Sequence, residues 1–203
     1  MKSLIDNIIA IEWNEFQKVE NEGGRAACQD NWKTFEIARK SQFLSWNEEM
    51  LKSYYNDLTK ATKEGRNLLT EKYARMMEST APDKYKIIKD KLPAISDNMK
   101  KLIEDIIKIR IKWAEDFAEL YPKISGNGRL IHSYEDNAYS TSSETYLRGE
   151  LSTYSEKTIE LYYEYVNKLL EQGKNQAMMI MENTAEAYGY KSLDEAENKL
   201  SNL

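Results

Sequence analysis

Residues 3–21 read SLIDNIIAIEWNEFQKVEN, and this stretch decides the fold class. At about 100° per residue, its large apolar side chains fall on a single helical face, with the carboxylate of Glu12 at the centre of that face. The apolar members of the face are Ile5, Ile8, Ile9, Phe16 and Val19. The pattern predicts an amphipathic helix that directs one charge into the protein core.

Two later segments repeat this pattern around an arginine. Arg39 lies among Trp32, Phe35, Phe43, Trp46 and Met50, and Arg110 lies among Met99, Leu102, Ile106, Trp113 and Phe117. An unpaired buried charge is costly, so we expect these groups to pair with each other or with a ligand. We predict that Glu12 and Arg39 meet, either directly or through Tyr73 or Glu144.

The composition supports a helical fold for the whole chain. The 203 residues are 41% hydrophobic and 31% charged, which is enough for one substantial core, and no shift in composition divides them. Only eight glycines and three prolines occur, and alternating β-branched runs are few. We therefore predict a single all-α domain over residues 1–203, an irregular bundle of about six to eight helices in which shorter helices pack against long ones.

Capping residues and helix breakers predict where the helices begin and end. The expected helices cover residues 3–21, 30–65, 67–79, 82–92, 96–121 and 142–173, with two short helices after Gly173. The segment 30–65 is expected to be continuous, although a capping box at 45–48 (SWNE) leaves a break open. Residues 123–141 form the longest irregular stretch, and loops of this length often carry function.

Charge and cysteine content exclude several classes of partner. The net charge of −5 is spread over interleaved Lys and Glu residues, which argues against nucleic acid. The start MKSLID reaches an acid too early for a signal peptide, and no apolar run approaches about 18 residues, so we expect a cytoplasmic protein without a membrane partner. The single cysteine excludes an internal disulfide and a multi-cysteine zinc site.

Several segments resemble the signatures of a known but uncharacterised bacterial family. They are residues 12–13 (EW), 21–30 (NEGGRAACQD), 34–35 (TF), 39–43 (RKSQF), 46 (W), 67–77 (NLLTEKYARMM), 144–151 (ETYLRGEL), 153–155 (TYS) and 188–190 (YGY). The family is catalogued only as a domain of unknown function, so the resemblance implies no activity. Some relatives are joined to, or encoded beside, a nucleotidyltransferase-like domain, which implies a possible partner of that kind.

The connector 23–30 offers a first set of candidate residues. Two glycines allow close approach of a ligand, and Arg25 together with the start of a helix could hold an anion. The same features favour the thiolate of Cys28. The alternative is an ordinary tight turn, with Cys28 as a small buried residue.

Glu144 and Arg148 form a second candidate pair. Their spacing of four residues is typical of a surface ion pair, but Glu144 lies near an apolar face, and Gly149 leaves room for a ligand or another backbone. Tyrosine hydroxyls and tryptophan rings nearby in the fold would complete a pocket.

We accordingly predict one polar pocket with aromatic walls. The predicted catalytic residues are Glu12 and Cys28, and the predicted ligand-binding residues are Arg25, Arg39, Trp46, Tyr73, Arg110, Glu144, Arg148 and Tyr154. No metal ligands or cofactor are assigned, although a carboxylate-only site built from Glu12, Glu20, Glu144 and Glu150 stays open.

Two functions are compatible with this pocket. The first is a small-molecule-binding protein or enzyme that recognises an anionic or amide-bearing ligand. The second is a non-enzymatic helical module for a nucleotidyltransferase-like partner, with the buried charges fixing the packing of the helices. A ligand-sized cavity lined by the charges favours the first function, and a fully self-satisfied cluster without a void favours the second.

Overall fold

The computed structural model describes residues 1–21, 23–137 and 139–200, and its regular structure is helical throughout. The α-helices are α1 (Lys2–Phe16), α2 (Trp32–Leu44), α3 (Glu48–Lys63), α4 (Leu68–Thr80), α5 (Pro82–Ile88), α6 (Asp97–Leu120), α7 (Pro122–Gly126), α8 (Ser143–Leu151), α9 (Glu156–Glu171), α10 (Gln176–Ala187) and α11 (Leu193–Lys199). Short 3-10 helices are η1 (Ala27–Asp30), η2 (Lys89–Lys91) and η3 (Ser133–Glu135). The all-α prediction is confirmed, but the predicted count of helices is too low.

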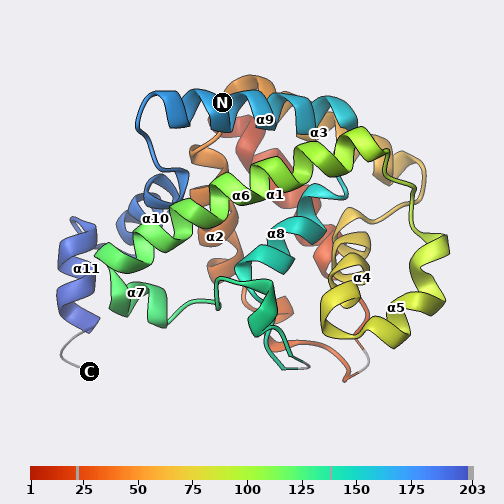
Figure 1. The fold of residues 1–203 in the computed structure, drawn as a ribbon, viewed down its shortest axis with the longest axis horizontal. Helices are drawn as coiled ribbons and strands as arrows, with labels where there is room; N and C mark the ends of the chain where they lie inside the picture. Colours follow the sequence, from red (N-terminus) through yellow and green to blue (C-terminus); the bar gives the residue numbers. More distant parts are fainter. Residues whose placement is uncertain (22, 138, 201–203) are drawn as a thin grey trace.

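Helix α8 lies near the centre of the molecule (Figure 1). It packs against α4 on one side and against α6, which in turn packs along α9. Helix α1 packs against α2, α3 and α4, and α10 joins α2 to α6. The fully buried side chains of the main core come from α1, α2, α3, α6, α8 and α9, for example Ile8, Phe43, Leu51, Ile106, Leu151 and Tyr162. None of the helices in the described ranges has both the length and the apolar character that a membrane crossing requires.

The expected continuous helix over 30–65 is wrong, because the chain breaks at residues 45–47. The side chain of Asn47 caps α3 by accepting a hydrogen bond from the backbone N–H of Met50 at 2.8 Å. A distant residue satisfies the end of α2, since the Tyr165 hydroxyl donates to the Ser45 carbonyl at 2.7 Å. The break also lets Trp46 turn inward, where it is buried.

The expected helix of about thirty residues over 142–173 is likewise two helices. Ser155 caps α9 through Thr158, and Asp57 of α3 holds the junction. The Asp57 carboxylate accepts the backbone N–H of Ser155 at 3.0 Å and the hydroxyl of Thr158 at 2.6 Å. The break between α8 and α9 is therefore held by a contact between Asp57 and Ser155, which lie 98 residues apart in the sequence.

Helix α1 ends at Phe16 rather than near Asn21. Two amide side chains from elsewhere in the chain bind the carbonyl groups at its end. Gln29 donates to the carbonyls of Phe16 at 2.8 Å and Val19 at 3.0 Å, and Asn67 donates to that of Glu15 at 2.8 Å. These contacts satisfy carbonyl groups that another helical turn would otherwise bind.

Candidate functional site

Four charged side chains from four helices meet inside the protein. Glu12, Arg39, Lys72 and Glu150 come from α1, α2, α4 and α8, and each is at most 7% exposed. The Arg39 guanidinium donates to both Glu12 oxygens, from Nε at 2.7 Å and from Nη2 at 2.6 Å. Its Nη1 lies 3.2 Å from Glu150, whose other oxygen lies 2.5 Å from Lys72 Nζ. The predicted Glu12–Arg39 contact is confirmed, and we call these four residues the buried charge cluster.

The buried charge cluster is neutral and rich in hydrogen bonds, because its two carboxylates face two cations. Tyr54 donates its hydroxyl to Glu12 at 2.7 Å, and Tyr154 donates to Glu150 at 2.8 Å. Gln42 also donates its side-chain amide to Glu150, at 3.0 Å. The cluster thus needs no ligand to satisfy its charges.

The environment keeps Glu150 ionised. Burial alone raises the pKa of this carboxyl group, but the charges of Arg39 and Lys72 and the hydrogen bond from Lys72 outweigh burial. The resulting pKa lies well below the usual range for glutamate. A carboxylate held in this way is a poor proton acceptor near neutral pH.

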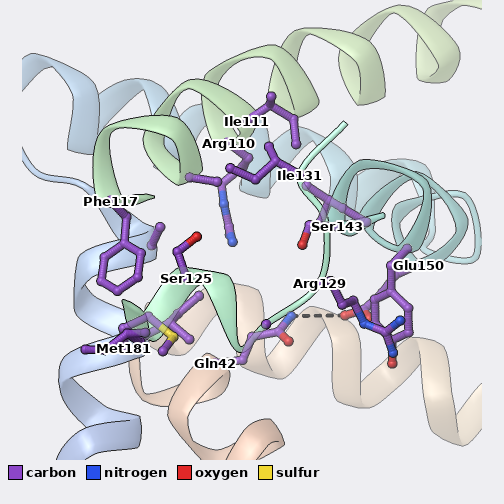
Figure 2. A pocket seen from close by; sticks show the side chains of 17 residues that line it. Gln42, Arg110, Ile111, Phe117, Ser125, Arg129, Ile131, Ser143, Glu150 and Met181 are labelled. Carbon is purple, nitrogen blue, oxygen red and sulfur yellow. Dashed lines mark hydrogen bonds between the residues drawn. The ribbon is translucent and has the colours of Figure 1, made fainter. Parts of the chain in front are cut away.

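A cavity of about 320 Å³ lies against the buried charge cluster, and its lining includes Glu150 of the cluster and Gln42, which donates to Glu150. Most of its lining comes from α6, α8, α10 and the segment 124–131. The lining residues in these elements include Ile111, Ala114, Ile124, Ser125, Gly128, Ile131, Ser143, Tyr146, Leu147, Ala177 and Ile180. Figure 2 shows Phe117 and Met181 on one side of this space and Glu150 on the other. The cavity therefore has an apolar side and a polar side.

Two guanidinium groups line the cavity without a carboxylate partner in the described parts of the chain. Figure 2 shows Arg110 extending into the cavity from α6. Its Nη1 donates to the side-chain oxygens of Tyr162 and Gln176, while its Nε is buried without an acceptor. Arg129 donates to the Thr141 carbonyl at 3.3 Å, and its Cζ lies 4.5 Å from the centre of the Tyr146 ring.

The connector residues lie away from this cavity, whose lining does not include them. Arg25 donates to Asp30 at 2.8 Å and to the Gln29 carbonyl at 2.9 Å, and it is exposed. Cys28 is exposed rather than buried. Gly24 has φ +85°, as a tight turn requires. The geometry is that of an interhelical turn.

The Glu144–Arg148 pair also lies apart from the buried charge cluster. Arg148 donates to Glu144 at 2.8 Å and to Glu104 at 2.8 and 2.9 Å. Glu144 further accepts the backbone N–H of Ser133 at 2.7 Å. Arg148 lines a separate groove between α4, α6 and α8. Because Glu12 and Arg39 meet directly, Glu144 does not act as the intermediary that the sequence analysis allowed for.

The aromatic candidates Trp46, Tyr73 and Tyr154 are not part of the cavity lining, and each packs against other rings. Trp46 is buried against Tyr54, Tyr154 and other rings, and its indole N–H has no hydrogen-bond partner among the residues that the structure describes. Tyr73 stacks near Phe16, with ring centres 6.2 Å apart, and burial raises its pKa. The single pocket predicted from the sequence is therefore divided into a buried charge cluster, a cavity beside it, a groove and a surface turn.

Sequence reasoning missed Lys72, Gln42 and Arg129. Lys72 carried a usable signal, because it lies between Leu69 and Met76 on the apolar face of α4. Arg129 carried none beyond its position in a long loop. The described residues contain no group of three or more His, Cys, Asp or Glu side chains arranged to hold a metal ion.

The comparison with protein families agrees with the signatures in the sequence. A model for a protein of unknown function matches residues 2–198. The chain belongs to the DUF4125 family. Membership in DUF4125 covers nearly the whole chain but brings no activity with it. No curated protein and no solved structure matches the chain.

Proposed function

We propose that this DUF4125 protein binds a small organic molecule in the cavity between α6, α8 and α10. The observation that carries the proposal is the pair of guanidinium groups, Arg110 and Arg129, at a largely apolar cavity without a carboxylate partner among the described residues. Ligand pockets are typically apolar spaces of about 300–1,000 Å³ with a few convergent polar groups. A volume of about 320 Å³ suits a compact ligand.

The buried charge cluster supports the cavity in this proposal. It fixes Glu150 and Gln42, which form part of the polar wall, through contacts with Arg39 and Lys72. Glu12 is 0% exposed and is not part of the cavity lining, so its role in this proposal is structural. The proposed function is therefore binding of a ligand, with no chemical reaction.

The self-satisfied cluster is also what an accessory module for a nucleotidyltransferase-like protein would need. That alternative rests on the family resemblance, whereas binding has the adjacent cavity in its favour. Both the partner and a cytoplasmic location stay predictions.

A thermal-shift screen against a metabolite library tests the proposal, because a ligand that binds only the folded state raises the melting temperature. The control is Ala114→Leu, which adds a larger side chain to the cavity wall. We expect some compounds to stabilise the wild-type protein and not the variant. A library without such a compound, or equal shifts in both proteins, would count against the cavity as the binding site.

A further inference from the structure

Three arginines elsewhere in this protein each bind one carboxylate in the same geometry. In each case Nε and Nη2 donate to the two oxygens of one carboxylate. The pairs are Arg39 with Glu12 at 2.7 and 2.6 Å, Arg66 with Glu71 at 2.8 and 2.7 Å, and Arg148 with Glu104 at 2.8 and 2.9 Å. This two-bond arrangement matches the planar fork of guanidinium to the planar carboxylate.

In Arg110, the edge formed by Nε and Nη2 has no carboxylate partner among the described residues. Its hydrogen bonds to Tyr162 and Gln176 both come from Nη1. Within the described residues, Nε has no acceptor and no bond to Nη2 occurs. Arg110 already extends into the cavity, but its Nε is buried, so a ligand reaches the full edge only when the guanidinium rotates to expose this atom. Binding would relieve the penalty of a buried donor without an acceptor.

The remaining polar groups of the cavity favour a ligand that accepts hydrogen bonds. The Glu150 oxygens already accept from Arg39, Lys72, Gln42 and Tyr154. The side-chain oxygen of Gln42 accepts from Arg39 at 2.8 Å. The oxygens of Glu150 and Gln42 already accept hydrogen bonds from protein groups, so they are poor partners for the N–H donors of an amide or ammonium ligand. A carboxylate ligand has only acceptors, which suit the free donors of the arginines.

We propose that the ligand is a carboxylate with an aromatic or branched apolar body. Its carboxylate pairs with the Nε and Nη2 edge of Arg110, Arg129 adds a second positive charge, and the body lies against Phe117 and Met181. This inference rests on the proposed function, because it requires the cavity to be the binding site. It decides between the anionic and the amide-bearing ligands that the sequence left open.

Two probes of nearly equal shape test the inference, naphthalene-1-acetate and its neutral amide, naphthalene-1-acetamide. Isothermal titration calorimetry at pH 7 measures both Kd values. We expect wild-type protein to bind the carboxylate at least about tenfold more tightly than the amide, as a charge-assisted pair predicts. In Arg110→Gln the preference should fall below about threefold, with the Kd of the amide little changed.

Two further variants complete the design. Arg75→Gln removes an arginine that lines the separate groove, and it should keep the full preference. Tyr162 donates to Gln176 at 3.1 Å without the help of Arg110, and we expect this hydrogen bond to persist in the variant and support its folding. If Arg110→Gln does not fold, Arg110→Lys carries the test, because it keeps the charge but loses the two-donor edge and should weaken carboxylate binding about tenfold.

The outcomes separate the two proposals. Equal affinity for both probes overturns the carboxylate inference and leaves the binding cavity in place. A carboxylate preference that survives both Arg110 variants overturns the role of Arg110. If neither probe binds, the inference fails, while the library screen with Ala114→Leu still decides the proposed function.

Discussion

The buried charge cluster makes a strong prediction, because its charges balance only as a set. Lys72→Met leaves the cluster with a net charge of −1, Glu150→Gln leaves it at +1, and the double variant is neutral again. Lys72 Nζ lies 2.5 Å from the Glu150 oxygen, a separation at which unit charges attract by about 7 kcal/mol at an effective dielectric constant of about 20. Removing Lys72 also removes the cost of burying its ammonium, so we expect a net loss of about 3–5 kcal/mol.

Urea unfolding followed by circular dichroism measures these losses. Each single variant should lower the unfolding midpoint by about 1–3 M. The double variant should be more stable than the sum of the single losses predicts by about 2–3 kcal/mol, as directly coupled residues show. The matched control is Lys52→Met, which removes an exposed ion pair of 2.6 Å to Glu48 and should barely move the midpoint. Additive losses in the double variant would refute the charge-balance argument.

Three other predictions follow from named contacts. The lowered pKa of Glu150 stabilises the folded state fully above about pH 4.3, the unfolded value, and this stability is lost as the pH falls toward the folded value. Glu150→Gln should therefore show a smaller drop in unfolding free energy between pH 7 and pH 3 than wild type, and an equal drop would contradict this. A Cβ at Gly149 would lie 2.7 Å from the Met76 side chain and 2.9 Å from the Lys72 carbonyl oxygen. Gly149→Ala should thus destabilise by about 1–3 kcal/mol in urea unfolding, despite the better helix propensity of alanine, and a stabilised variant would show that α4 and α8 can separate freely. Asn47→Ala removes the cap on Met50 and should cost about 1 kcal/mol, visible as a lower melting temperature, whereas an unchanged melting temperature would assign the break at 45–47 to tertiary contacts alone.

Helical periodicity was sufficient to find half of the buried charge cluster. Glu12 and Arg39 each stand at the centre of an apolar face, and the cost of burying a lone charge predicts their contact. The same rule applies to Glu150, which lies three residues after Leu147 and four before Tyr154, but the prediction favoured Glu144, three residues before Leu147. At about 100° per residue the two carboxylates lie about 60° from Leu147 on opposite sides, so both border the same apolar face and periodicity alone does not choose between them.

Helix breaks and the cavity depend on contacts that local patterns do not contain. The junction before α9 is held by Asp57, and the end of α1 by Gln29 and Asn67. Each partner is an ordinary polar residue in its own segment, so its role follows only from the fold. The same holds for Arg129, which reaches the cavity from a long connection.

The wide sequence spacing of the buried charge cluster has a consequence for how the chain is made. Arg39 lies 27 residues from Glu12 but 111 from Glu150, and Lys72 lies 78 residues from Glu150. While a ribosome has yet to release α8, the emerging chain holds Glu12, Arg39 and Lys72, one carboxylate for two cations. We expect this nascent segment to bury its cations only once α8 arrives, so that the last long-range ion pairs close late in synthesis and a chain stalled before α8 stays open to chaperones and proteases.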